Sequence, residues 1–463
     1  MKTSIEHKIF LTKAEKVAFD RKHRETIKFN MSKYDAAVKK GKAIYKNLDL
    51  ARTRAGQIKY RVISDLEKLI IEFEHNFEKN GGKVIWAQTA EQAVNEIYKI
   101  LKKRKVKKVV KSKSMITEEI ELNRELEKKE IEVVETDLGE FIVQQANQKP
   151  YHIVTPAMHL SKEDIASLYH KKFNTPENLN PTELTNYTRE LLRKKFVEAD
   201  AGITGANFLI AETGSIALTE NEGNGLMSIS FPKVHIAVAG IEKIIPRLED
   251  LDLFWPLLAT HGTGQNLTSY SSIISGPIKN DEKDGPKEMF LILLDNGRTN
   301  LLSKERQRQA LSCIRCGACL NVCPVYKNIG GHTYGVTYSG PIGAVITPHL
   351  LDFGKYKHLS FASSLCGACT EVCPVKIPLH ELLLVNRKEA IENGFYTFFE
   401  KKSIDVATFA LSSRKRLDMV GGDVKNFLMK LTVKKAWGPR RELPEMAKKS
   451  FSQLWKEEKG KKE

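Results

Sequence analysis

Residues 313–324 read Cys-Ile-Arg-Cys-Gly-Ala-Cys-Leu-Asn-Val-Cys-Pro, and this stretch decides the fold of the C-terminal half of the chain. Its spacing, C-x2-C-x2-C-x3-C-P, is the run that bacterial ferredoxins use to hold [4Fe–4S] clusters. Three thiolates on one tight loop reach three corners of a single iron–sulfur cube, while the proline turns the fourth cysteine away. The stretch therefore predicts an α-helical, ferredoxin-like domain.

A second copy of the pattern occupies residues 363–374, which read Ser-Ser-Leu-Cys-Gly-Ala-Cys-Thr-Glu-Val-Cys-Pro. The two runs contain all 7 cysteines of the chain, and Ser363 stands where the second run lacks its first cysteine. In two-cluster ferredoxins the last cysteine of each run ligates the other cluster. The predicted ligands of cluster one are therefore Cys313, Cys316, Cys319 and Cys373. The predicted ligands of cluster two are Cys323, Cys366 and Cys369.

Cluster two is one thiolate short, and the sequence leaves its fourth iron position open. An oxygen of Ser363 or Ser364, a hydroxide and a side chain of a partner protein are alternative ligands. A further alternative is that the fourth iron is absent, which leaves a [3Fe–4S] cluster. We therefore expect two iron–sulfur clusters that differ in their ligands.

Structural zinc and disulfides are the other common uses of such cysteines, and the pattern favours neither. Zinc sites usually join two separated C-x2-C pairs, whereas here four cysteines crowd into one short run that ends in proline. Disulfides are disfavoured because the number of cysteines is odd and nothing marks the chain as secreted. The sequence thus favours redox chemistry.

Length and composition indicate an ordinary globular chain of 463 residues, enough for about three domains. The first twenty residues mix Lys, Glu and His with apolar residues, which is not the pattern of a signal peptide. No apolar run approaches the length of a membrane-spanning helix. We expect a cytoplasmic, reducing environment.

The net charge of +17 raises the question of an anionic partner. The segment from Lys401 onward is rich in Lys and Arg, but no nucleic-acid-binding motif accompanies it, so nucleic acid is not expected. An acidic partner subunit, or anionic lipid through peripheral membrane association, is the better use of this charge.

Hydrophobic patterning divides the chain into four parts. Residues 1–60 read as an N-terminal arm of amphipathic helices, and residues 61–300 alternate between helices and short apolar strands. Such alternation is typical of an α/β domain with a largely parallel sheet. Strands are predicted at residues 83–87, 106–110, 131–135, 208–211, 215–219, 234–240 and 290–294. The iron–sulfur domain follows at 301–390, and 391–463 form a basic helical tail.

Three residues of the α/β domain are candidates for catalysis: Glu212, Glu222 and Lys111. Lys111 ends a predicted strand, where α/β domains usually place their ligands, and the alternative is a basic strand terminus without a ligand. The two glutamates lie next to glycines and are able to act as acid, base or nucleophile. Alternatively, their carboxylates accept hydrogen bonds from the backbone of the turns. A loop histidine, His261, is a weaker candidate.

Several stretches together resemble the lactate utilisation protein B family, and the resemblance covers nearly the whole chain. They are residues 111–115 (Lys-Ser-Lys-Ser-Met), 135–140 (Glu-Thr-Asp-Leu-Gly-Glu), 202–224 with Ala-Glu-Thr-Gly at 211–214, the two cysteine runs, 340–348 between them, and 450–455. The resemblance implies that residues 61–300 are a LUD domain with the fold of CoA transferases and ribose-5-phosphate isomerase. It also implies that three-cysteine ligation of cluster two belongs to the family.

The same resemblance implies a function. The chain would be an iron–sulfur electron carrier in a complex that oxidises L-lactate to pyruvate, with a cysteine-rich subunit and a second LUD-domain protein as partners. The alternative is that the LUD domain is itself an enzyme acting on a hydroxy-acid, acyl or sugar-phosphate substrate, with the clusters as its relay. Related domains often have a basic residue after the Asn-Glu-Gly-Asn segment. Here Gly225, Leu226 and Met227 follow, which argues against a phosphate or CoA anion at that loop.

Overall fold

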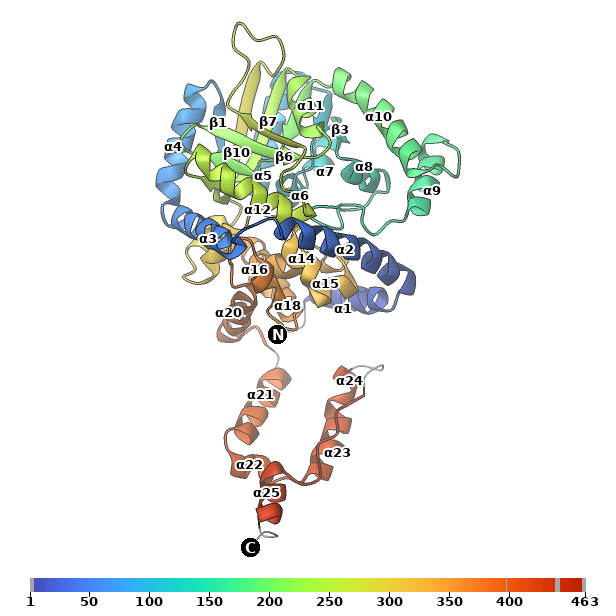
Figure 1. Ribbon diagram of the computed structural model, residues 1–463, viewed down its shortest axis with the longest axis vertical. Coiled ribbons are helices and arrows are strands. Elements are labelled where there is room, and N and C mark those ends of the chain that lie inside the picture. Colours follow the sequence, from blue (N-terminus) through green and yellow to red (C-terminus); the bar gives the residue numbers. More distant parts are fainter. Residues whose placement is uncertain (1–3, 397, 438–441, 460–463) are drawn as a thin grey trace. The chain divides into compact units, whose positions relative to one another are not determined.

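The computed structural model describes residues 4–396, 398–437 and 442–459 (Figure 1). The chain divides into two compact units, with the boundary between Glu392 and Asn393. The first unit contains the N-terminal helices, the α/β domain and both cysteine runs. The second contains the helices that follow Asn393.

The chain begins with the predicted helical arm, and α4 continues it into the α/β domain. The helices are α1 (Ile5–Ala18), α2 (Arg21–Lys42), α3 (Leu48–Ser64) and α4 (Leu66–Lys79). Ser4, Asp20 and Asn47 each accept a backbone hydrogen bond in the first turn of the helix that follows, which fixes the starts of α1, α2 and α3. The arm packs against the rest of the unit through buried apolar residues such as Phe10, Ile27 and Val62.

A six-stranded sheet forms the centre of the α/β domain, in the order β1-β10-β7-β4-β2-β3. Its strands are β1 (Lys83–Ala87), β2 (Lys108–Lys111), β3 (Glu132–Glu135), β4 (Ala201–Thr204), β7 (Val234–Gly240) and β10 (Glu288–Leu294). Every neighbouring pair is parallel, so all carboxyl ends lie at one edge of the sheet. Ligands of open parallel sheets bind outside that edge.

Helices cover the sheet and connect its strands. They are α5 (Ala90–Lys103), α6 (Met115–Glu119), α7 (Leu122–Glu127), α8 (Leu138–Gln145), α9 (Lys162–Phe173), α10 (Pro181–Glu198), α11 (Asn224–Ser230) and α12 (Leu251–Thr263). One core lies between the sheet and α5, around Ile97 and Ile236, and another packs α4 on the sheet through Phe73 and Phe77. The predicted α/β architecture is confirmed.

A second, smaller sheet has the order β8-β5-β6-β9. Its strands are β5 (Phe208–Ile210), β6 (Ser215–Glu220), β8 (Ile244–Ile245) and β9 (Tyr270–Ile274). β5 and β6 form an antiparallel hairpin. Gly214 in its turn has a φ of 58°, and a Cβ there would lie 2.2 Å from the backbone nitrogen of Phe77, so the turn needs glycine.

Three strands were not expected from the sequence: β4, β8 and β9. β4 is the most consequential of them because it lies inside the main sheet, between β7 and β2. Gly202 within β4 has no room for a side chain, since a Cβ would lie 1.7 Å from the carbonyl oxygen of Ser228 on α11. Gly202 is therefore required by the close approach of a helix to the strand.

The cysteine region is built from helices. They are α13 (Arg298–Leu302), α14 (Ala318–Val322), α15 (Pro324–Ile329), α16 (Gly340–Leu350), α17 (Phe353–Tyr356), α18 (His358–Phe361), α19 (Ala368–Val372) and α20 (Leu379–Glu392). α16 is buried along almost its entire length and is the centre of this part. Figure 1 shows the region beside α2 and α3, and α15 packs against both α1 and α2.

The second unit contains α21 (Phe398–Leu411), α22 (Arg414–Asp418), α23 (Gly422–Thr432), α24 (Lys434–Trp437) and α25 (Phe451–Lys459). Its large apolar side chains are mostly exposed, including Phe409 at 61%, Phe427 at 65% and Phe451 at 71%. A helix long and apolar enough to span a bilayer is absent from the described residues of both units.

Candidate metal centre

The two cysteine runs form loops with the same backbone. Arg315 and Leu365, which precede the second cysteine position of each run, have φ angles of 62° and 54°. Gly317 and Gly367, which follow it, have φ angles of 78° and 82°. Positive φ is costly for arginine and leucine, and such strain is typical of loops shaped around a ligand. The helices that begin after the glycines, α14 and α19, pack against each other.

The first cysteine group lines one small cavity and consists of Cys313, Cys316, Cys319 and Cys373. Ile314, Ile342, Ile377 and other apolar residues complete the wall, together with Arg315. Burial raises the pKa of Cys373 to about 11, although the hydrogen bond from the Ile377 amide opposes this shift. The amide of Ile377 donates a hydrogen bond to the Cys373 Sγ at 3.4 Å. The structure thus brings together the four cysteines predicted for cluster one.

The second cysteine group consists of Cys323, Cys366 and Cys369. Burial, together with the neighbouring Cys323 and Cys366, raises the pKa of Cys369 to about 11. The amide of Tyr326 donates to the Cys323 Sγ at 3.5 Å. Cys366 is exposed, whereas the other two are buried. This group is therefore more open to solvent than the first.

Ser363 accepts the hydrogen bond that corresponds to one made by a cysteine in the first loop. The amide of Leu365 donates to the Ser363 Oγ at 3.1 Å. In the first loop the amide of Arg315 donates to the Cys313 Sγ at 3.4 Å. The hydroxyl of Ser363 thus stands where the missing thiol would be, beside the second cysteine group.

The donor set fits iron–sulfur clusters. The small cavity is walled by four thiols, one arginine and apolar or glycine residues, which is the environment of a soft-ligand site. Thiols this deeply buried stay protonated on their own, because burial raises their pKa. A bound cationic centre stabilises them as thiolates, and backbone N–H groups share the negative charge of the sulfurs.

A buried network of charges lies between the first cysteine group and the sheet. Arg298 makes ion pairs at 2.7 Å with Glu119 and with Glu242. Glu242 also pairs with Arg315 at 3.3 Å, and the Tyr338 hydroxyl donates to Glu119 at 2.6 Å. Burial alone would raise the pKa of Glu242, but Arg298 and Arg315 lower it to about 2. The network therefore joins the α/β domain to the cysteine loop.

Two lysines add positive charge on the same side. Lys59, from α3, is buried and donates to the carbonyl oxygens of Glu242 at 2.7 Å and Ile244 at 3.1 Å. Burial lowers the pKa of Lys59 to about 7. Burial, followed by the charge of Arg315, lowers the pKa of Lys243 to about 8.

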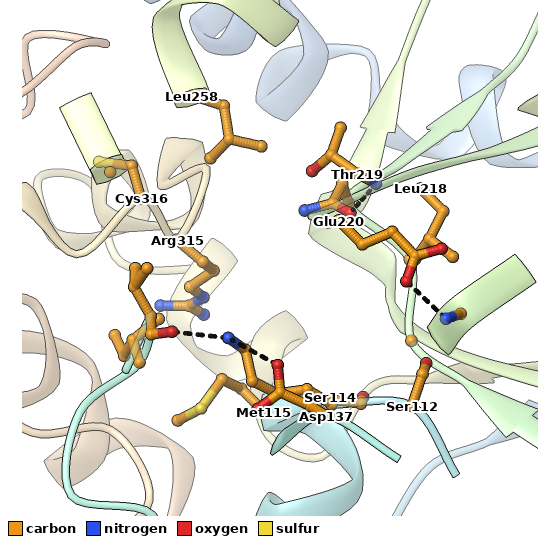
Figure 2. A pocket seen from close by; sticks show the side chains of 18 of the residues that line it. Ser112, Ser114, Met115, Asp137, Leu218, Thr219, Glu220, Leu258, Arg315 and Cys316 are labelled. Atoms are coloured by element: carbon orange, nitrogen blue, oxygen red, sulfur yellow. Dashed lines mark hydrogen bonds and ion pairs between the residues drawn. The ribbon is translucent and has the colours of Figure 1, made fainter. Parts of the chain in front are cut away.

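A larger cavity of about 380 Å³ opens at the carboxyl edge of the main sheet; we call it the sheet-edge cavity. Ser112 and Ser114 after β2, Asp137 after β3 and Gly205 after β4 line it from the sheet. Arg315 and Cys316 line it from the cysteine loop. Figure 2 shows Arg315 and Cys316 on one side, with Thr219 and Glu220 across from them. The cavity thus extends from the α/β domain to a cysteine predicted to ligate cluster one.

Acidic side chains form the wall opposite Arg315. Glu220 accepts hydrogen bonds from the amides of Gly225 and Leu226 at the start of α11. Glu222 accepts from the amide of Leu138 at 3.0 Å. Partial burial, and then the neighbouring charge of Asp137, raises the pKa of Glu222 to about 7. Glu222 is therefore able to exchange a proton near neutral pH.

The three catalytic candidates do not meet. Of Glu212, Glu222 and Lys111, only Glu222 lines the sheet-edge cavity. Lys111 is fully buried in ion pairs with Glu135 at 2.7 Å and Glu118 at 3.4 Å. Glu212 accepts from the amide of Leu248 at 2.9 Å, so its carboxylate satisfies the backbone. This arrangement favours structural roles for Lys111 and Glu212.

His261 is not in a loop, as the sequence suggested, but in the last turn of α12. It is buried, and its Nδ1 lies 2.9 Å from the carbonyl oxygen of Leu257 one turn earlier. Burial lowers the pKa of His261 to about 4. A neutral histidine bonded to its own helix is a core residue.

Comparison with known proteins gives two domains and a family. The LUD domain profile matches residues 70–294, and the 4Fe-4S dicluster domain profile matches residues 309–377. Lactate utilization protein B of Bacillus cytotoxicus is 45% identical over 415 residues, which cover 87% of both chains. The chain belongs to the lactate utilization protein B family.

Other members of the lactate utilization protein B family are similarly close. The Shouchella clausii protein is 43% identical over 423 residues, covering 88% of this chain and 87% of its own length. The Bacillus cereus protein is 44% identical over 414 residues, 87% of each chain. A crystal structure of a DUF162 family protein from Deinococcus radiodurans covers half of this chain at 17% identity, with a TM-score of 0.26, and is too distant to extend the fold assignment.

In this chain, sequence reasoning missed residues at the junction of the two domains: Arg315, Glu242 and Lys243. Arg315 lies inside the first cysteine loop but is not one of the predicted ligands. Glu242 and Lys243 follow β7, at the carboxyl edge of the sheet. That position was the available signal, because ligand-binding residues concentrate there. Their meeting with the cysteine loop depends on domain docking, which no local pattern encodes.

Proposed function

We propose that this protein is an iron–sulfur electron-transfer subunit in the oxidation of L-lactate to pyruvate. The observation that carries the proposal is the gathering of seven thiols into two groups within a 4Fe-4S dicluster domain. Bound clusters supply one-electron transfer. The names of the relatives, lactate utilization protein B, support lactate as the source of the electrons.

The proposed ligands of cluster one are Cys313, Cys316, Cys319 and Cys373. Those of cluster two are Cys323, Cys366 and Cys369, with Ser363 in the fourth position. The amides of Arg315, Tyr326 and Ile377 hold three of the sulfurs through hydrogen bonds. Such bonds, together with burial, tune the potential of a cluster.

The two clusters face different surroundings, which supports a direction for the relay. Cluster one adjoins the sheet-edge cavity through Cys316. Cluster two is held by the exposed Cys366 and is the better site for exchange with another protein. We therefore place cluster one on the side of the LUD domain and cluster two on the side of a partner.

The proposed partners are a cysteine-rich subunit and a second LUD-domain protein. The second unit supports this role because it is basic and exposes large apolar side chains, including Phe409 and Phe427. Large exposed apolar patches with charged surroundings are typical of binding surfaces. We propose a cytoplasmic location; the same surface is an alternative contact for an anionic membrane.

Anaerobic purification with iron and sulfide analysis and EPR tests this proposal. About eight irons per chain are expected for two cubane clusters, and about seven if cluster two is a [3Fe–4S] cluster. Zinc in place of iron would contradict the redox role. The purified chain alone should not oxidise L-lactate with an artificial acceptor, whereas the chain together with both partners should.

A second candidate function is that the LUD domain is itself an enzyme for a hydroxy-acid, acyl or sugar-phosphate substrate. Its proposed fold, shared with CoA transferases and ribose-5-phosphate isomerase, is compatible with this. The observation in favour is Glu222, a carboxylate with a pKa of about 7 in the wall of the sheet-edge cavity. Turnover by the chain alone that is lost in Glu222→Gln but kept in Glu212→Gln would establish this function.

A further inference from the structure

We propose that the sheet-edge cavity binds a small carboxylate anion through Arg315 and Lys243, and that binding of this anion is linked to the oxidation state of cluster one. The inference deepens the proposed function and rests on it, because it requires a cluster at Cys313, Cys316, Cys319 and Cys373. It concerns a site between the LUD domain, which contributes Lys243, and the first cysteine loop, which contributes Arg315.

Arg315 has an unused donor at this site. Its Nη2 lies 3.3 Å from Glu242, and its guanidinium lies 4.4 Å from the centre of the Tyr338 ring. Its Nη1 is buried and has no hydrogen-bond partner among the described residues. An unpaired donor on a buried charge is costly. Because Arg315 lines the sheet-edge cavity, a ligand there is the natural acceptor.

Lys243 is a second cation in the wall of the same cavity. Within the described residues its ammonium has no hydrogen-bond acceptor and no carboxylate within ion-pair distance, in contrast to Lys59, which donates to two carbonyl oxygens. Lys243 follows Glu242, whose carboxylate pairs with Arg315 at 3.3 Å, so the two positive groups lie in the same part of the cavity wall. Two adjacent cations with free donors form a site for one anionic group.

Cations outnumber carboxylates among the side chains at this site. The cations are the buried Lys59, Arg298 and Arg315 and the half-buried Lys243, and the buried carboxylates are Glu119 and Glu242. Glu119 forms an ion pair with Arg298, and Glu242 forms ion pairs with both Arg298 and Arg315. Neither carboxylate forms an ion pair with Lys59 or Lys243. An anion bound between Lys243 and Arg315 would supply the acceptor that the Arg315 Nη1 lacks among the described residues.

The rest of the cavity selects the kind of anion. Asp137, Glu220 and Glu222 also line the cavity, with Glu220 across from Arg315 (Figure 2), and their charges disfavour a ligand with several negative groups, such as an organic phosphate. The hydroxyls of Ser112 and Ser114 are buried and lack partners among the described residues. They suit a neutral polar group of the ligand. A monocarboxylate that also carries a hydroxyl or oxo group suits these side chains. Its planar carboxylate matches the guanidinium of Arg315, and its hydroxyl or oxo group matches the serine hydroxyls.

Arg315 also connects the site to cluster one. It lies between Cys313 and Cys316, and its amide donates to the Cys313 Sγ. An anion on its guanidinium cancels positive charge beside the cluster and makes reduction of the cluster less favourable. Linkage is reciprocal, so reduction of cluster one must weaken binding of the anion by the same factor. The cavity therefore holds its anion when cluster one is oxidised and releases it when the cluster is reduced.

The test is anaerobic calorimetry on the full-length protein with its clusters, oxidised and dithionite-reduced. L-Lactate, pyruvate and inorganic phosphate are the probes. We expect saturable binding of the carboxylates to the oxidised protein, at least about fivefold weaker binding after reduction, and no competition by phosphate. EPR titration should show cluster one harder to reduce when the carboxylate is present.

The variant Lys243→Met should weaken carboxylate binding at least about tenfold while iron content stays that of the wild type. The matched control is Lys233→Met, which changes an exposed lysine outside the cavity and should bind as the wild type does. Unchanged binding in Lys243→Met, equal affinity in both oxidation states, or displacement by phosphate would each overturn the inference. If the clusters are present and carboxylates do not bind, the inference alone fails. If iron is absent, the proposed function fails first.

Discussion

Ser363 takes, in the second cysteine loop, the place that Cys313 takes in the first. Each side chain accepts a hydrogen bond from the amide two residues later, at 3.1 Å to the serine oxygen and 3.4 Å to the cysteine sulfur. The backbone of the repeat is therefore complete, and only the ligand atom differs. An oxygen ligand is harder than a thiolate, so the two clusters should differ in spectrum and stability.

The variant Ser363→Ala should destabilise the fourth iron of cluster two, because it removes the oxygen beside that position. Iron analysis should fall by about one iron per chain, with a [3Fe–4S] EPR signal after mild oxidation. Ser363→Cys should restore about eight irons and suppress that signal. Ser364→Ala, which changes the exposed neighbouring serine, is the control. Identical iron content and spectra in Ser363→Ala and the wild type would exclude Ser363 as a ligand.

Arg52→Met should make cluster one more labile. Arg52 on α3 donates to the carbonyl oxygens of Cys373, at 3.0 Å, and Glu371. Loss of hydrogen bonds from a charged donor costs about 1.5–3 kcal/mol. We expect faster loss of iron–sulfur absorbance in air and a lower unfolding temperature under anaerobic conditions. Arg54→Met, at an exposed position on the same helix, should behave as the wild type; equal lability of both variants would disprove the role of Arg52.

Lys111→Met should be among the most damaging single substitutions in the LUD domain. The ammonium of Lys111 is fully buried and pairs with Glu135, and its charge also lowers the pKa of Glu140. Removing one partner of a buried ion pair typically costs about 3–5 kcal/mol. Denaturant unfolding measures this loss. Lys107→Met, on the exposed residue beside the same strand, should change stability by less than about 0.5 kcal/mol.

Glu140→Gln should change how stability depends on pH. Burial, followed by the charges of Glu135 and Glu118, raises the pKa of Glu140 well above its ordinary value of 4.5. As the pH rises past that value, the unfolded chain releases the proton and the folded chain keeps it, so the folded state loses stability. The glutamine variant lacks this loss. It should gain stability relative to the wild type between about pH 5 and pH 8, and parallel pH profiles would contradict the assignment.

The exposed phenylalanines of the second unit should matter for assembly and not for cluster binding. Phe409→Ser combined with Phe427→Ser should reduce co-purification with the coexpressed cysteine-rich subunit and second LUD-domain protein, because both side chains are exposed. Iron content should not change. Lys430→Ser in the same unit tests charge alone. Full co-purification of the double variant would place the partner surface elsewhere.

Much of the fold was predictable because its signals are local. The run at 234–240, apolar except for the buried His235, has the observed bounds of β7, since a strand buried on both faces is nearly continuous in apolar residues. β4 has no such apolar run in the sequence because Gly202 interrupts it. In the structure this glycine allows α11 to pack on the strand. A contact of this kind is invisible in a local pattern.

The residues of the candidate site also divide into those with a local sequence signal and those without one. The spacing of the cysteines assigns two ligand groups because ferredoxin loops follow a local rule. The sheet-edge cavity follows no such rule. Arg315 meets Glu242 only after the cysteine region has docked on the sheet, and the two residues are 73 positions apart. Lys111 has a local signal that misleads, because its position at the end of a strand suggested that it binds a ligand. In the structure its ammonium forms an ion pair with Glu135 on the neighbouring strand.

The contact between Arg52 and the carbonyl oxygen of Cys373 spans 321 positions, and this has a consequence for biosynthesis. At about 5–20 residues per second, roughly 16–64 s pass between the synthesis of the two residues. During that interval the amphipathic arm has been synthesised, but its contact with Cys373 does not yet exist. The arm therefore completes its packing on the cysteine region only after the second cysteine run has been translated.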